Sequence, residues 1–128
     1  MKVLLDTVTF LDSALATKDL SKSAKSLLLD SESELYVSVI SFWEIVIKYS
    51  IGKLALPHSP HHFLPQHRLK LGADILPLEE ESALHVLRLP HLHNDPFDRI
   101  LISQAIVHGM ILLTPDPRIS RYPVRTAW

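Results

Sequence analysis

The chain has 128 residues, of which 47% are hydrophobic and 21% charged, and only three are glycines. This composition excludes a disordered or low-complexity chain, and the length predicts a single domain over residues 1–128 with one core. With 13 basic and 14 acidic residues the net charge is −1, so no global positive field attracts a nucleic acid. The absence of cysteine excludes disulfides, cysteine-based zinc sites and thiol nucleophiles.

The apolar segments are too short or too interrupted for a signal-peptide core or a membrane span. Asp6 ends the first apolar run at once, and Glu44 and Lys48 interrupt the longest one. We therefore expect a soluble, cytoplasmic protein that does not bind a membrane.

Short apolar runs predict strands, and helical periodicity with capping residues predicts the helices between them. In chain order, the expected elements are a strand at 2–5, helices at 7–16 and 21–30, a strand at 35–37, a helix at 39–50, a short helix within 57–72, a strand at 73–78, a helix from 79 to before 90, a helix at 96–108, a strand at 110–114 and a short edge strand at 124–127. The strands are apolar rather than alternating, which is typical of strands buried on both faces. This order predicts an α/β fold with a central, mostly parallel sheet of four to five strands and helices on both faces.

The helix expected at 96–108 carries a carboxylate on its apolar face. Asp95 is a favoured N-cap residue, and Pro96 fits the first helical position. At about 100° per residue, Asp98 lies on the same face as Leu101. An acid at the third helical position also complements the helix dipole, so a structural and a functional interpretation of Asp98 are both open.

Glu44 repeats this pattern in the helix expected at 39–50. Isoleucines lie four residues before it and three residues after it, which places the acid on an apolar stripe. The structural alternatives are an ion pair with Lys48 and a capping box from Ser41 to Glu44.

Two further acids, Asp6 and Asp116, each come just past the end of an expected strand. In parallel α/β folds, sites form outside the carboxyl ends of the strands. We therefore expect Asp6 and Asp116 to converge with Glu44 and Asp98.

Convergence of ionised carboxylates has a cost that a cation removes. Two such groups about 5 Å apart repel by roughly 3 kcal/mol at an effective dielectric constant near 20. Oxygen ligands of this kind select Mg²⁺ or Mn²⁺. Such a metal can hold a phosphate and activate a water, which predicts phosphodiester hydrolysis.

Four stretches of the sequence carry a resemblance to a known family. They are Leu4-Leu5-Asp6-Thr7, Ser41-Phe42-Trp43-Glu44-Ile45, the run from Asp95 to Ala105 that begins Asp-Pro-Phe-Asp-Arg, and Leu113-Thr114-Pro115-Asp116-Pro117-Arg118. They resemble the PIN-domain family, specifically the VapC-type toxins of toxin–antitoxin pairs, and the likeness runs from end to end. The resemblance implies a Mg²⁺-dependent ribonuclease that acts on RNA, forms a homodimer and is held inactive by a cognate antitoxin, whose C-terminal segment covers an acidic groove.

The resemblance also implies roles for individual residues. The catalytic and metal-binding acids are Asp6, Glu44, Asp98 and Asp116, with Thr7 and Thr114 as polar support and Asp95 as the helix cap. Independently of the resemblance, a ribonuclease needs local basic residues to hold RNA phosphates, and the candidates are Lys48, Lys53, Arg99, Arg118 and Arg121. An ordinary solvated charge is the alternative for each of them. The chain departs from the subgroup at Val8, where His is common, and at Asp12-Ser13, where an aromatic pair is common. These departures concern substrate placement more than metal binding.

Two other classes compete with a nuclease. A catalytically inert PIN-like interaction module predicts the loss of at least one acid, and all four are present. A phosphate-receiving regulatory domain predicts paired acids beside the first strand and a lysine on a later strand. This chain has one acid at its first strand and no lysine after Lys70.

Overall fold

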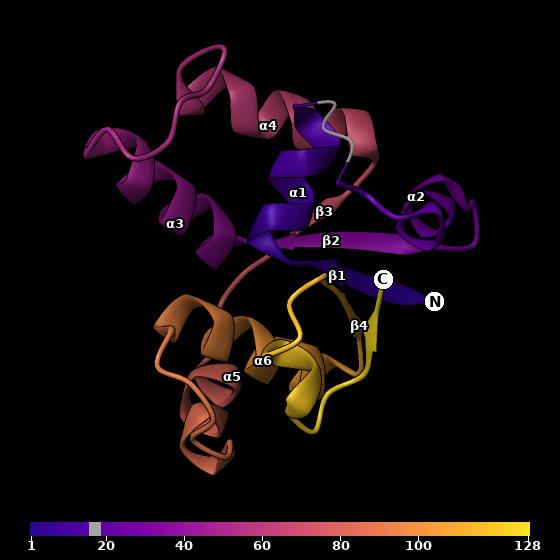
Figure 1. Cartoon of the computed structure of the whole chain (residues 1–128), viewed down its shortest axis with the longest axis vertical. Coiled ribbons are helices and arrows are strands. Elements are labelled where there is room, and N and C mark those ends of the chain that lie inside the picture. Colours follow the sequence, from indigo (N-terminus) through magenta and orange to yellow (C-terminus); the bar gives the residue numbers. More distant parts are fainter. Residues whose placement is uncertain (16–18) are drawn as a thin grey trace.

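A sheet of five strands, all parallel, runs through the middle of the structure (Figure 1). This computed structural model describes residues 1–15 and 19–128. The strands are β1 (Lys2–Leu5), β2 (Glu34–Ser38), β3 (Asp74–Leu76), β4 (Ile111–Leu113) and β5 (Thr126–Ala127). Their spatial order is β3-β2-β1-β4-β5, so β1 is the central strand. The predicted α/β fold with a parallel sheet is confirmed.

Helices occupy the connections between the strands. They are α1 (Thr7–Ala14), α2 (Lys22–Leu29), α3 (Val39–Ser50), α4 (Pro60–Leu71), α5 (Glu80–His85) and α6 (Pro96–His108), with short 3₁₀ helices η1 (Val86–Arg88) and η2 (Ile119–Arg121). The bounds of α3 and α6 are those predicted from the sequence, and α6 ends at Gly109, whose φ of 65° suits a residue without a side chain. None of the helices that the described residues form is long and apolar enough to cross a membrane.

Three helices differ clearly from the prediction in length. The helix predicted from 79 to before 90 is α-helical only over Glu80–His85 and continues as the 3₁₀ helix η1. α4 is a 12-residue helix rather than a short one, because burial of Phe63 and Leu64 stabilises it although Pro65 removes one backbone hydrogen bond inside it. α1 ends at Ala14, and the last residue predicted for this helix, Ala16, lies outside the described residues.

The apolar residues form two clusters, not the one core expected from length. Successive side chains of β1 point to opposite faces, so Leu4 belongs to one cluster while Val3 and Leu5 belong to the other. A sheet covered on both faces separates its apolar residues into two layers. In Figure 1, α1 to α4 lie on one side of the sheet and α5 and α6 on the other.

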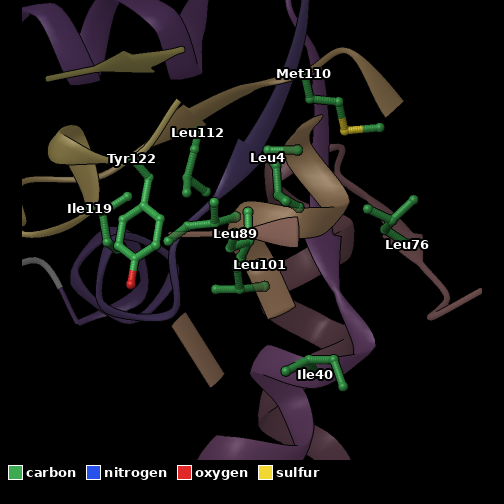
Figure 2. Close-up of a cluster of buried hydrophobic side chains, with 11 residues drawn as sticks. Leu4, Ile40, Leu76, Leu89, Leu101, Met110, Leu112, Ile119 and Tyr122 are labelled. Atoms are coloured by element: carbon green, nitrogen blue, oxygen red, sulfur yellow. The ribbon is translucent and has the colours of Figure 1, made fainter. Parts of the chain in front are cut away.

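Figure 2 shows the cluster on the α6 side of the sheet. Leu4 and Leu112 enter it from β1 and β4, and Leu101 enters it from α6. Tyr122 closes the cluster from the segment that follows η2, and it is only 3% exposed. The cluster therefore fixes α6 and the C-terminal segment against the central strands.

The parallel arrangement brings the residues that follow β1, β2 and β4 to one edge of the sheet. The backbone N–H of Asp6 donates to the carbonyl of Leu113 at 3.1 Å, which holds the ends of β1 and β4 together. α3 starts directly after β2 at the same edge and packs against α6. The segments that carry Asp6, Glu44 and Asp116 therefore meet at this edge.

Candidate functional site

A cleft of about 390 Å³ lies at the carboxyl edge of the sheet. Its charged lining residues are the acids Asp6, Glu44, Asp95, Asp98 and Asp116 and the bases Lys48, Lys53 and Arg118. All four acids that the sequence singled out thus line one cleft, and the helix cap adds a fifth. Val8, one of the departures from the family pattern, also lines it.

Asp6 lies at the bottom of this site and is 4% exposed. One carboxylate oxygen, Oδ1, accepts a hydrogen bond from the backbone N–H of Thr7 at 2.7 Å, so Asp6 caps α1. The other, Oδ2, accepts one from the Thr114 hydroxyl at 2.7 Å. Burial raises the pKa of Asp6 to about 6, the Thr114 hydrogen bond opposes that rise, and the charges of Asp98 and Glu44 add to it.

The hydroxyl of Thr7 is directed to α3 instead of to the carboxylates. It donates to Ser41 Oγ at 2.8 Å and so ties the start of α1 to α3. The capping box from Ser41 to Glu44, considered as a structural alternative, does not form, because the N-cap of α3 is Ser38, three residues before Ser41. Ser38 Oγ accepts from the backbone N–H of Ile40 at 3.0 Å.

Glu44 is buried on α3 and is 5% exposed. Its Oε2 lies 2.5 Å from the Nζ atom of Lys48, and this hydrogen bond raises the pKa of the lysine. The ion pair considered as a structural alternative therefore exists, and it lies on the wall of the cleft.

Asp95 and Asp98 have different surroundings at the start of α6. Asp95 Oδ1 accepts hydrogen bonds from the backbone N–H groups of Phe97 at 2.9 Å and Asp98 at 3.1 Å, which is an N-cap arrangement. Asp98 is 9% exposed, and its Oδ2 lies 3.0 Å from His93 Nε2. Burial raises the pKa of Asp98, and the hydrogen bond with His93 partly offsets that rise.

Asp116 is the most accessible of the four acids that the sequence singled out. The guanidinium of Arg118 donates two hydrogen bonds to it, from Nε to Oδ1 at 3.2 Å and from Nη2 to Oδ2 at 2.9 Å. This guanidinium lowers the pKa of Asp116. The backbone N–H of Asp116 donates to Thr114 Oγ1 at 3.1 Å, so Thr114 connects it to Asp6.

The possible metal ligands in the cleft are carboxylate oxygens, which are hard ligands of the kind that Mg²⁺ or Mn²⁺ prefers. The carboxylates are close enough for the charges of Asp98 and Glu44 to raise the pKa of Asp6. Within the described residues no three Asp, Glu or His side chains are grouped closely enough to hold a metal ion. The reason is that Glu44, Asp98 and Asp116 are each turned to a different partner, namely Lys48, His93 and Arg118. A shared cation would require Glu44 and Asp116 to turn from Lys48 and Arg118 into the cleft, whereas His93 occupies only one of the two oxygens of Asp98.

The basic residues predicted to hold phosphates fall into two groups. Lys48, Lys53 and Arg118 line the cleft. Arg99 does not, and the expectation that it contacts substrate is wrong: it is 9% exposed, and its Nη1 donates to the Pro90 carbonyl at 2.9 Å and to Tyr122 Oη at 3.0 Å. Arg121 lies exposed in η2 and is not among the residues that line this cleft.

His93 has no role that the sequence pattern alone predicts. Its position five residues before Asp98 was the available signal, but its second contact, Tyr122, is 29 residues away in the chain. Such a contact comes from the tertiary structure and leaves no local pattern.

Comparison with known proteins identifies the family and supports the fold. The PIN domain family model matches residues 3–125 of the chain. Among solved structures, the chain is similar to one in VapBC2 from Rickettsia felis, which is bound to a DNA fragment from its promoter. The two chains are 17% identical, the match covers 99% of this chain and 98% of that chain, and the TM-score is 0.75. DNA-bound VapBC from Salmonella typhimurium gives 18% identity, coverage of 99% and 97%, and a TM-score of 0.69. FitAcB from Neisseria gonorrhoeae gives 20% identity, coverage of 97% and 95%, and a TM-score of 0.62. A search of curated protein sequences finds no match.

The structural likenesses, at these identities, concern the fold. Receiver domains have the strand order 2-1-3-4-5, whereas this sheet has the order 3-2-1-4-5, so the phosphoreceiver alternative is excluded. Because the family model covers nearly the whole chain, this protein belongs to the PIN domain family.

Proposed function

We propose that this protein is a VapC-type toxin, a Mg²⁺- or Mn²⁺-dependent endoribonuclease that hydrolyses RNA phosphodiesters with one PIN-like domain over residues 1–128. The observation that carries the proposal is the cleft in which Asp6, Glu44, Asp98 and Asp116 come together from four parts of the chain. Burial of such charges without a cation destabilises the fold, which favours a site that is completed by a metal.

The four acids are the residues that would hold the cation. Bound there, a divalent metal supplies an activated water and stabilises charge on the phosphate. Thr114 and the backbone N–H of Thr7 orient Asp6 through both of its oxygens. The alternative role of Asp6, as a cap for α1 alone, accounts for Oδ1 but not for the Thr114 hydrogen bond.

The basic residues of the cleft then have a second use. Lys48 and Arg118 now neutralise Glu44 and Asp116, and they become free to bind phosphate oxygens when those carboxylates face a metal. Lys53 lines the same cleft. Together they supply the local positive charge that the chain as a whole lacks.

The proposal includes protein partners. One similar solved structure is a toxin–antitoxin complex from Klebsiella pneumoniae, and an antitoxin is the expected partner of this chain as well. Five acidic residues around one cleft favour a partner segment that carries arginine. A homodimer is the assembly that we expect for the toxin.

The test is cleavage of a defined RNA by the chain expressed alone, with Mg²⁺, Mn²⁺ or EDTA. Cleavage is expected with either metal, and it should disappear in EDTA and in Asp98→Asn. Asp74→Asn is the matched control, because Asp74 is an exposed acid on β3 and does not line the cleft.

Two results would overturn the proposal. Cleavage that persists in EDTA, or in Asp98→Asn at the wild-type rate, excludes the metal mechanism. Mn²⁺ binding without cleavage of any RNA supports the inert interaction module instead.

A further inference from the structure

We propose that His93 is a positioning residue that holds Asp98 for metal binding, and that Tyr122 and Arg99 fix the state of His93. The inference rests on the proposed function, because it concerns one of its acids. The observation behind it is a continuous chain of hydrogen bonds from Arg99 through Tyr122 and His93 to Asp98.

The hydrogen bonds at the Tyr122 hydroxyl determine the direction of this chain. Its oxygen accepts from Arg99 Nη1 at 3.0 Å and from the backbone N–H of His93 at 3.2 Å. A phenol oxygen has two lone pairs and one proton, so both acceptor positions are then used. The hydroxyl must therefore donate its proton to its third neighbour, His93 Nδ1, at 2.7 Å.

This donation sets the tautomer of His93. Because Nδ1 accepts a proton from Tyr122, the ring hydrogen of the neutral imidazole is on Nε2. Nε2 lies 3.0 Å from Asp98 Oδ2 and donates to it. The arginine is a permanent donor, so the direction of the whole chain follows from Arg99.

The surroundings keep these groups in place. The side chains of His93 and Asp98 are 9% and 12% exposed, and Tyr122 is 3% exposed. Figure 2 shows the Tyr122 ring in the apolar cluster beside Ile119, with its hydroxyl at the outer end. The His93 and Tyr122 rings meet edge to face, with their centroids 5.4 Å apart.

The consequence for Asp98 is that its two oxygens become different. Oδ2 is occupied by His93, whereas Oδ1 has no hydrogen-bond partner among the described residues. Oδ1 is thus the atom available to a metal, and His93 limits rotation of the carboxylate. Hydrogen-bonded residues behind a metal ligand commonly change metal affinity about 10- to 100-fold when they are removed.

A purely structural role is the alternative. Arg99 also binds the Pro90 carbonyl, and the network joins the loop before α6 to the C-terminal segment. If that were its only role, loss of His93 would lower the melting temperature and leave metal affinity unchanged.

The experiment measures the Mn²⁺ dissociation constant by calorimetry, and the melting temperature in EDTA, for matched variants. His93→Leu removes the donor to Asp98, and we expect Mn²⁺ affinity to fall about 10- to 100-fold. His93→Gln places an amide N–H at a similar reach and should recover most of that affinity. Tyr122→Phe keeps the ring in the cluster, frees His93 Nδ1, and should give a smaller loss of the same sign.

His67→Leu is the control variant. His67 also binds a side chain, Ser13 Oγ, at 2.8 Å, but neither residue lines the cleft. This variant should change the melting temperature and leave Mn²⁺ affinity as in wild type. If His93→Leu does not fold, His93→Gln is compared with Tyr122→Phe, in which the ring keeps its packing. The inference then predicts nearly wild-type Mn²⁺ affinity for His93→Gln and a lower affinity for Tyr122→Phe.

The results separate this inference from the proposed function. A wild-type chain that binds no Mn²⁺ overturns the proposed function, and this inference with it. Wild-type Mn²⁺ affinity in His93→Leu and Tyr122→Phe overturns only the inference. Nitrogen chemical shifts of the metal-free imidazole give an independent readout: we expect the proton on Nε2, and a proton on Nδ1 instead would also overturn the inference alone.

Discussion

Asp6 is the residue whose environment most opposes its charge. Its pKa is raised from 3.8 to about 6, chiefly by burial. Between these values the folded chain binds more protons than the unfolded chain, so this group's contribution to stability is greatest below about pH 4. The contribution of Asp6 to the free energy of unfolding falls as the pH rises towards 6 and stays constant above that. The total loss is about 3 kcal/mol, because that is the free energy of a shift of about two pKa units.

Asp6→Asn in EDTA is therefore expected to gain stability relative to wild type as the pH rises from 4 to 6. The variant keeps an acceptor for the Thr7 N–H and removes the buried charge. Melting curves of both proteins between pH 4 and 8 measure this difference, with Asp74→Asn as the control for loss of an exposed acid. If the melting temperatures of wild type and Asp6→Asn change in the same way with pH, burial does not destabilise the ionised carboxylate of Asp6.

Lys48 competes with a metal for Glu44, because the same carboxylate oxygen cannot fully serve both. Lys48→Met should raise Mn²⁺ affinity, by up to about fivefold if the pair is worth the usual 0.2–1 kcal/mol of an accessible ion pair. RNA binding should weaken, because a phosphate contact is lost. Calorimetry with Mn²⁺ and a binding titration with RNA measure the two effects.

Lys53→Met is the comparison for that prediction. Lys53 lines the cleft without an ion pair to an acid among the described residues. Its loss should weaken RNA binding with little change in Mn²⁺ affinity. If Lys48→Met and Lys53→Met change Mn²⁺ affinity equally, the ion pair between Lys48 and Glu44 does not compete with metal binding.

At the scale of the element, the start of α6 combines a structural acid and a proposed ligand three residues apart. Asp95→Ala should destabilise the chain by about 1 kcal/mol, because two backbone N–H groups lose their acceptor, and should leave Mn²⁺ affinity nearly intact. Asp98→Ala should leave stability in EDTA close to wild type, because loss of the His93 hydrogen bond is offset by removal of a buried charge.

Calorimetry with Mn²⁺ and melting curves in EDTA compare the two alanine variants directly. Asp98→Ala is expected to lose metal binding severely. If Asp95→Ala is the variant that stops binding metal, Asp95 is the metal ligand and Asp98 has the structural role.

At the scale of the whole molecule, the acidic cleft is the feature that a protein partner would recognise. We expect a partner segment with arginine to enter the cleft, contact its carboxylates and inhibit the proposed nuclease activity. If an antitoxin is encoded beside this chain, co-expression of the two, followed by RNA cleavage assays on the purified complex and on the free chain, tests this. Substitution of the partner's arginine by alanine should restore activity, and a complex that cleaves RNA as fast as the free chain would exclude inhibition through the cleft.

Local patterns in the sequence determined the elements and the candidate acids. Strand and helix positions follow from apolar periodicity, and the limits of α6 follow from Asp95 and Gly109, because capping depends on neighbouring residues. The positions of Asp6 and Asp116 just past strand ends were enough to predict that they meet at one edge of a parallel sheet.

Only the tertiary structure decided the order of the strands, the division into two apolar clusters and the partners that lie far away in the chain. Asp6 binds Thr114, 108 residues away, and His93 binds Tyr122, 29 residues away. Arg99 follows Asp98 directly, yet its guanidinium is buried against Tyr122 and not in the cleft. The physical reason is that hydrogen bonding and burial depend on which distant segments pack together, whereas periodicity and capping depend on residues within a few positions of each other.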